Sequence, residues 1–172
     1  MTNMKVWDIF VRVFHWSLVI CFSLNALILD DESRWHPWVG YAVMGLLATR
    51  ILWGFLGTKY ARFNSFPPDF SQAVGQLREM ASPKAKIHVG HTPLGALMIY
   101  NLIATLITIC ASGYLMTTDM FWGVEWPETV HETAVAWAEI CIVLHIAAVL
   151  LESVRTRINL PRAMVTGYKR IP

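Results

Sequence analysis

Four apolar stretches of about twenty residues dominate this sequence and leave few alternatives for its fold. They cover about residues 10–29, 38–56, 93–116 and 133–152. The hydrocarbon core of a bilayer is about 30 Å thick, so a helix needs about 20 apolar residues to cross it. Within that core the backbone can satisfy its hydrogen bonds only in helices or closed barrels. We therefore predict an all-α integral membrane protein, a four-helix bundle that forms a single domain over residues 1–172.

The composition agrees with a membrane bundle and argues against other classes. Of the 172 residues, 55% are hydrophobic and 15% are charged, whereas about a quarter of the residues in a soluble domain are charged. This balance argues against a disordered chain and against most soluble enzymes. The net charge of +2 is too small to indicate a nucleic-acid partner. Cys21, Cys110 and Cys141 each lie alone in an apolar stretch, so we interpret them as buried hydrophobic residues.

The basic residues predict how the bundle is oriented. Of the fourteen Lys and Arg residues, all except Arg34 lie near the termini or in and beside the 57–92 loop. The positive-inside rule then places both termini and this loop in the cytoplasm. The two outer loops carry acidic residues instead: Asp30, Asp31, Glu32, Asp119, Glu125 and Glu128.

The 57–92 loop contains one segment with helical periodicity. Asp69 is placed to cap a short helix that runs to Met80, in which Phe70, Val74 and Leu77 recur at helical spacing. Such a helix suits the membrane interface. An ordered loop beneath the bundle is an equally consistent interpretation.

Four of the six histidines form two pairs at different depths. His131 and His145 lie 14 residues apart on the fourth stretch. This spacing is nearly four helical turns, so both side chains share a face and are separated by about 21 Å along the axis. His15 lies near the cytoplasmic end of the first helix, and His36 lies at the outer start of the second. The spacing therefore predicts an inner pair, His15 and His145, and an outer pair, His36 and His131.

Histidine pairs from facing helices of a bundle are suited to holding haem iron from both sides. We predict two b-type haems, an inner one on His15 and His145 and an outer one on His36 and His131. They would be non-covalent, because the sequence has no C-x-x-C-H motif. A non-redox membrane anchor, or a small transporter that binds a divalent metal through these histidines, is the alternative. That alternative requires histidines gathered at one level, which the 14-residue spacing disfavours.

Three arginines are placed to bind haem propionates by charge-assisted hydrogen bonds. Arg12 lies one turn before His15, and Arg50 lies 14 residues after His36 and so at the inner level. Arg34 lies beside His36 at the outer level. For Arg12 and Arg34 the alternative is a helix-end charge that extends to water.

Two further polar residues require interpretation. His91, at the inner start of the third helix, could give a quinone both a hydrogen-bond donor and a proton route. The alternative is a structural residue bonded to a propionate or a backbone carbonyl. Glu139 lies near the membrane midplane with Asn101 at similar depth. We expect a neutral Glu139 that is hydrogen-bonded, with Asn101 as a candidate partner, rather than a proton relay.

Motifs along the whole chain resemble the bacterial cytochrome b561 family, and within it the branch that includes the b-type cytochrome subunits of nickel-iron hydrogenases. They are Val6-Trp7-Asp8, Arg12, Phe14-His15-Trp16, Gly40-Tyr41, Arg50-Ile51-Leu52-Trp53-Gly54 with Gly57, Gly90-His91-Thr92-Pro93-Leu94-Gly95-Ala96-Leu97, His131-Glu132, His145 and Ala163-Met164-Val165-Thr166-Gly167.

The resemblance implies a four-helix cytochrome of the bacterial inner membrane that holds two haems and exchanges electrons with quinone and a redox partner. Its haem ligands fall on His15, His36, His131 and His145. The first outer loop is shorter than in the hydrogenase subunits. This favours a small periplasmic c-type cytochrome as partner, or an independent oxidoreductase acting on quinol or superoxide. Membrane lipid and, as an open possibility, a second copy of the chain complete the expected partners.

Overall fold

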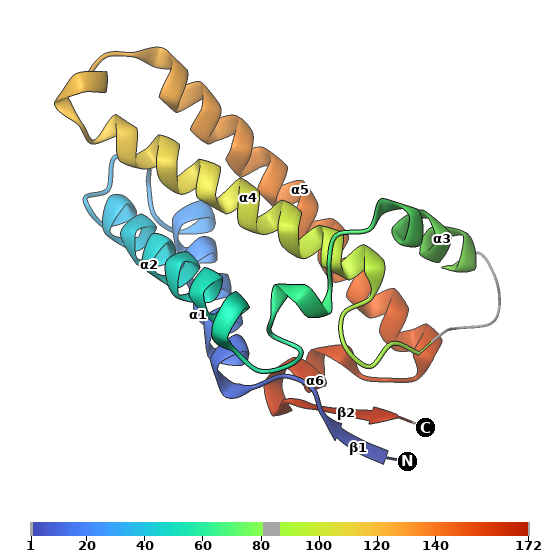
Figure 1. Ribbon diagram of the computed structural model, residues 1–172. Helices are drawn as coiled ribbons and strands as arrows, with labels where there is room; N and C mark the ends of the chain where they lie inside the picture. Colours follow the sequence, from blue (N-terminus) through green and yellow to red (C-terminus); the bar gives the residue numbers. More distant parts are fainter. Residues whose placement is uncertain (1, 81–86, 172) are drawn as a thin grey trace.

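The computed structural model describes residues 2–80 and 87–171, and it contains four long helices (Figure 1). Lys84 and Lys86 of the predicted cytoplasmic loop lie outside the described residues. The long helices are α1 (Ile9–Leu27), α2 (Trp35–Leu56), α4 (Pro93–Met116) and α5 (Glu125–Thr156). Each is long and apolar enough to cross a membrane. The prediction of an all-α membrane bundle is therefore confirmed.

The fourth spanning helix differs most from the sequence prediction. It begins at Glu125 rather than near residue 133, and it ends at Thr156. Glu125 and Glu128 lie in its first turn, where negative charge is favourable beside the free N–H groups of a helix. Pro127 is tolerated there because the first turn lacks partners for its N–H groups anyway. The helix therefore extends past the apolar segment that the sequence analysis counted.

The predicted helix in the 57–92 loop is present as α3 (Phe70–Met80). Asp69 caps it, since its Oδ1 accepts a hydrogen bond of 2.9 Å from the backbone N–H of Gln72. Its apolar residues Phe70, Val74 and Leu77 are exposed. They therefore point away from the bundle, as expected of a helix at the membrane interface.

The buried side of α3 is joined to the start of α4. Gln76 is buried, and its Oε1 accepts a hydrogen bond of 2.9 Å from the backbone N–H of Leu94. Thr92 accepts another from the N–H of Gly95 at 3.0 Å. These two side chains satisfy N–H groups that the first turn of a helix leaves without partners.

The long helices pack in a simple order. Helix α1 packs against α2, α2 against α4, and α4 against α5. A small core forms where α2 and α4 meet, from Val43, Leu47 and Leu106. At the end of the bundle away from the chain termini, the hydroxyl groups of Tyr41 and Thr117 lie 3.3 Å apart and link the same two helices.

The two chain termini pair with each other, which the sequence did not predict. Strands β1 (Thr2–Lys5) and β2 (Tyr168–Ile171) form an antiparallel sheet in which Thr2 lies opposite Ile171. The short helix α6 (Leu160–Thr166) precedes β2. We call these three elements, with the linked residues 6–8, the terminal cap. Figure 1 shows it closing one end of the bundle.

One glycine is required for the terminal cap to close. The carbonyl of Gly167 accepts hydrogen bonds from the backbone N–H groups of Val6 (2.9 Å) and Trp7 (3.1 Å). Gly167 has a φ of 87°, and a Cβ there would lie 2.7 Å from the carbonyl oxygen of Trp7. Both the left-handed conformation and the close approach therefore favour glycine.

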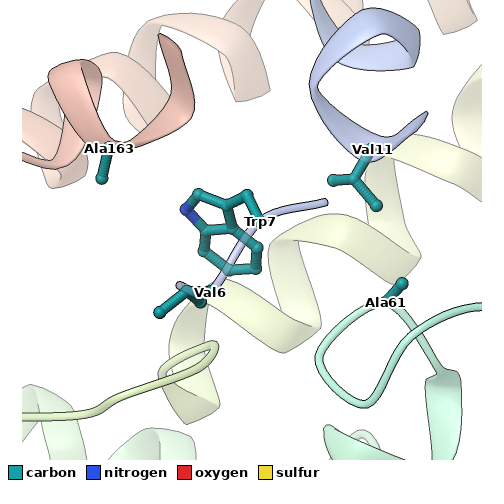
Figure 2. Close-up of a cluster of buried hydrophobic side chains, with 5 residues drawn as sticks. All are labelled: Val6, Trp7, Val11, Ala61 and Ala163. Carbon is teal, nitrogen blue, oxygen red and sulfur yellow. The ribbon is translucent and has the colours of Figure 1, made fainter. Parts of the chain in front are cut away.

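Behind this junction lies a small hydrophobic cluster that holds the cap on the bundle (Figure 2). Trp7 lies at its centre, among side chains from α1, α6 and the loop after α2. The members are Val6, Trp7, Val11, Ala61 and Ala163.

Asp8 joins the start of α1 to the end of α2. Its Oδ1 caps α1 by accepting from the N–H of Val11 at 2.8 Å, and its Oδ2 accepts from Trp53 Nε1 at 3.0 Å and from Thr58 Oγ1 at 2.6 Å. Burial alone would raise the pKa of Asp8. The hydrogen bonds from Thr58, Val11 and Trp53 outweigh burial and hold this pKa below its usual range.

We predict that Asp8→Ala lowers the free energy of unfolding by about 1–3 kcal/mol, because it removes a helix cap and two bonds between helices. Thermal unfolding in detergent, followed by circular dichroism, measures this change. The pKa of Asp8 is lower in the folded state than in the unfolded state. The ionised carboxylate of Asp8 therefore stabilises the fold above about pH 4, and this stabilisation is lost as the pH falls further.

Asp69→Ala is the matched control, since Asp69 bonds only within its own short helix, to Gln72. We expect a smaller effect from it, because it caps one exposed helix end and joins no other element. Equal effects of the two substitutions would contradict the role of Asp8 in joining the helices.

Candidate functional site

His36 and His131 lie beside each other at the end of the bundle opposite the terminal cap. His36 comes from α2 and His131 from α5, and their ring centroids are 6.2 Å apart. Bonds between a metal ion and an imidazole nitrogen are about 2 Å long, so two rings on opposite sides of one ion have centroids about 6 Å apart. The spacing of the outer pair therefore fits a shared iron.

Hydrogen bonds fix the ring of His131. Its Nδ1 lies 3.0 Å from the carbonyl oxygen of Ile109 and 3.3 Å from Ser112 Oγ. A carbonyl can only accept, so Nδ1 carries the proton and Nε2 keeps its lone pair. This arrangement is typical of metal-binding histidines, whose second nitrogen donates to a backbone carbonyl.

Two glycines lie near the outer pair, one packed against it and one beside open space. Gly113 on α4 faces His131, and a Cβ there would lie 3.1 Å from His131 Cε1. Gly40 lies one turn after His36 on α2 and is half-buried, yet a Cβ there would meet no atom within 4 Å. Open space one turn from His36 is consistent with a flat macrocycle bound there.

The inner pair, His15 and His145, comes from α1 and α5. Both rings are half-buried, and they are close enough for the charge of His145 to act on His15. Among the described residues, Nδ1 of His15 and Nδ1 of His36 are buried without a hydrogen-bond partner. Buried polar atoms are nearly always paired. These nitrogens are therefore consistent with groups that a ligand would complete.

Two of the three predicted arginines point into the protein. Arg50 is 4% exposed, its guanidinium lies 5.1 Å from the ring centroid of Phe63, and its Nη1 has no hydrogen-bond partner. Arg12 donates from Nη2 to the carbonyl of Val165 in α6, and its buried Nε is also unpartnered. Buried cations with unused donors favour an anionic ligand such as a carboxylate.

Arg34 lies in different surroundings. It is exposed, and its guanidinium lies 5.3 Å from the ring centroid of its neighbour Trp35. Of the two interpretations, these surroundings favour the helix-end charge that extends to water.

His91 is held between two aromatic rings. Its ring centroid is 4.2 Å from that of Phe66 and 4.6 Å from that of Trp7. Burial, together with the positive charges of Lys169 and Arg50, lowers the pKa of His91 to about 3. His91 is therefore neutral at physiological pH. Its ring makes no hydrogen bond to the described residues, so its nitrogens remain available.

Lys169 is a residue that the sequence analysis missed. It lies on β2 and is only 4% exposed, and its Nζ donates to the carbonyls of Gly90 (2.9 Å) and His88 (3.2 Å). Burial lowers the pKa of Lys169 to about 8, against the opposing effect of Glu152. A lysine near a chain end is normally exposed, so no sequence signal could have singled it out.

The expected contact between Asn101 and Glu139 is wrong. Asn101 instead accepts from Trp137 Nε1 at 3.3 Å and donates to the sulfur of Cys141 at 3.1 Å. Glu139 is exposed on α5. The two residues do share a depth, but Asn101 faces the side of α5 that carries Trp137 and Cys141.

The sequence model of the family prokaryotic cytochrome b561 matches residues 6–167. The chain belongs to this family. No curated protein and no solved structure gives a match.

Membership of the prokaryotic cytochrome b561 family gives the site its general chemistry. The protein is a b-type cytochrome that works in electron transfer and binds haem b. It is a multi-pass protein of the bacterial inner membrane. The two histidine pairs, the open space at Gly40 and the unpartnered arginine nitrogens all fit such a group.

We predict that Gly113→Ala disturbs the outer pair, because the new methyl group would press on the ring of His131 and weaken its hydrogen bond to Ile109. The haem absorption bands should shift or lose intensity. Gly45→Ala on α2 is the control, since a Cβ there meets nothing within 4 Å and the position is exposed. Identical spectra for the two variants would contradict this role of Gly113.

Proposed function

We propose that the protein carries two haems and transfers electrons between the quinone pool and a periplasmic redox partner. The inner haem would be held by His15 and His145, and the outer haem by His36 and His131. The observation that carries the proposal is the approach of His36 to His131 at one end of the bundle, 14 residues along α5 from His145. This spacing separates the two levels by about 21 Å along the helix axis.

Each haem, when bound, would supply one-electron chemistry, and two histidines at each level would leave no ligand position for oxygen. The chain provides the orientation and the charge around it. The hydrogen bond from His131 to the carbonyl of Ile109 holds the ring in place and makes its second nitrogen a stronger ligand. Arg12 and Arg50 would pair with propionates at the inner level.

His91 is the residue we propose to bind quinone. Trp7 and Phe66 fix its ring, and its neutral N–H can donate a hydrogen bond to a quinone carbonyl. The charge of Arg50 acts on His91, which supports a common position for both residues near the proposed inner haem. Because its pKa is about 3, His91 can orient a quinone but cannot store a proton for it.

The outer end suits a protein partner. The positive-inside rule places the termini in the cytoplasm, so the outer pair would face the periplasm. Asp31 and Glu132 are exposed and near enough for their charges to act on His131. Carboxylates beside the outer site favour a basic partner, such as a c-type cytochrome, by electrostatic steering.

The alternative of a non-redox anchor or metal transporter is less consistent with the evidence. The family is one of b-type cytochromes. Within residues 2–80 and 87–171, no three His, Cys, Asp or Glu side chains gather as a transported metal ion would require. Two histidines at each level instead suit an iron whose other ligands come from a macrocycle.

We predict two non-covalent haems per chain in a pyridine haemochrome assay of the purified protein. His36→Ala and His131→Ala should each remove the same haem, and His15→Ala and His145→Ala should each remove the other. Redox titration of the remaining haem identifies which one is lost. If the His36 and His15 variants lose the same component, the proposed pairing is wrong.

We also predict that His91→Phe slows the reduction of haem by quinol about tenfold, since the loss of one hydrogen bond to substrate costs about 1 kcal/mol or more. Phe keeps the packing against Trp7 and Phe66. His91→Gln, which restores a donor, should recover part of the rate. Because His91 stays neutral, the ratio of variant to wild-type rate should not change between pH 6 and 9; a ratio that falls with pH would contradict this.

A further inference from the structure

Lys169 places a buried ammonium group beside the proposed quinone residue. Its Nζ donates to the carbonyl of Gly90, the residue directly before His91. The same Nζ lies 5.5 Å from the ring centroid of Trp7, whose ring also contacts His91. Lys169 and His91 therefore lie against the same Trp7 ring, although they are far apart in sequence.

The hydrogen bonding of Lys169 is incomplete. An ammonium group has three N–H donors, and the carbonyls of Gly90 and His88 take two of them. Lys169 makes no third hydrogen bond to the described residues. Glu152 is near enough for its charge to act on Lys169 but does not hydrogen-bond to it. The third position on Nζ is an N–H in the ammonium form and a lone pair in the neutral amine. Neither form disturbs the hydrogen bonds to Gly90 and His88.

A quinone reaction needs a group that exchanges protons. Oxidation of a quinol to a quinone releases two electrons and two protons, and reduction takes up the same number. His91 has a pKa of about 3 and cannot carry these protons at neutral pH. Arg50 stays charged and cannot release one. Lys169, with a pKa of about 8, is protonated at pH 7 and can still release its proton.

We propose that Lys169 exchanges protons with a quinone bound at His91, an inference that rests on the quinone site proposed above. When quinol is oxidised, its two electrons would pass one at a time to the oxidised haem b that His15 and His145 would hold. The neutral amine of Lys169 accepts a hydroxyl proton at its third position and passes it to water at the cytoplasmic end. A second cycle removes the other proton. In quinone reduction the ammonium donates instead, and water recharges it.

The charged and titratable groups around Lys169 come from several elements. Glu152 belongs to α5, while His88 and His91 belong to the segment before α4. Arg50 of α2 acts on the same site through His91. On β1 the residue opposite Lys169 is Met4, which is apolar. Of these groups, only Lys169 both makes the two carbonyl hydrogen bonds and keeps a position open for a proton.

The test uses Lys169→Arg, which keeps a cation and its donors but cannot release a proton. Stopped-flow measurement follows the reduction of haem by quinol from pH 6 to 10 in the haem-loaded protein. The wild-type rate should rise with pH through about 8, because the neutral amine is the acceptor. Lys169→Arg should lose this rise, with rates at pH 9 about tenfold lower or more. Arg170→Gln, at an exposed neighbouring position on β2, should keep the wild-type profile.

A second readout does not depend on activity. Acetic anhydride reacts with neutral amines, so the yield of acetylated Lys169, measured by mass spectrometry from pH 6 to 11, reports its titration. Exposed Lys59 serves as the reference in the same sample. A midpoint near pH 8 supports the proposal. A midpoint near the ordinary lysine pKa of about 10.4, or no acetylation, overturns it, because an amine that a small reagent cannot reach cannot exchange protons with water.

The variants separate a proton role from a structural one. If Lys169→Arg keeps the wild-type pH profile while Lys169→Gln loses haem reduction or folding, Lys169 only holds the 88–90 segment in place and the proposal is wrong. If quinol does not reduce wild-type haem although dithionite does, the quinone function itself fails and the role of Lys169 fails with it. If quinol reduces wild-type haem normally and Lys169→Arg keeps the wild-type pH profile, the role of Lys169 is wrong while the quinone function stands.

Discussion

The need to hydrogen-bond every polar group inside the bilayer determines most of this structure. Helices satisfy the backbone, and many hydroxyl side chains bond to carbonyls of their own helix, as Thr105, Thr108 and Ser153 do. Buried polar atoms that have no hydrogen-bond partner therefore indicate where a ligand could bind. Among the described residues, buried side-chain atoms without partners belong to Arg12, His15, Asn25, His36 and Arg50. All but Asn25 are residues that the sequence predicted to bind haem.

The spanning helices could be predicted because length and hydropathy decide them locally. Their ends could not, since the start of α5 depends on capping charges outside the apolar segment. The terminal cap was also missed. Strands of four residues carry almost no periodic signal, and Thr2 pairs with Ile171 across nearly the whole chain. Such pairing depends on the bundle first bringing both termini to the same end.

Depth along a helix can be predicted from residue counts, whereas rotation about its axis cannot. Depth alone gave the pairs that the structure brings together, His36 with His131 and His15 with His145. Rotation depends on how neighbouring helices pack. For this reason the sequence placed Asn101 and Glu139 at a common depth but could not show that Asn101 faces Cys141 instead.

The terminal cap connects the fold to the proposed chemistry. The carbonyl of Val165 in α6 binds Arg12, and Lys169 on β2 reaches the segment that carries His91. The chain ends thus complete the inner site, where buried cations surround a neutral histidine. The outer site instead has exposed carboxylates near His131. A group of buried cations around a neutral histidine suits a small substrate whose reduced form can lose protons, and exposed carboxylates suit a basic protein. The difference in charge between the two ends is what the proposed function requires, with a small substrate at one end and a basic protein at the other.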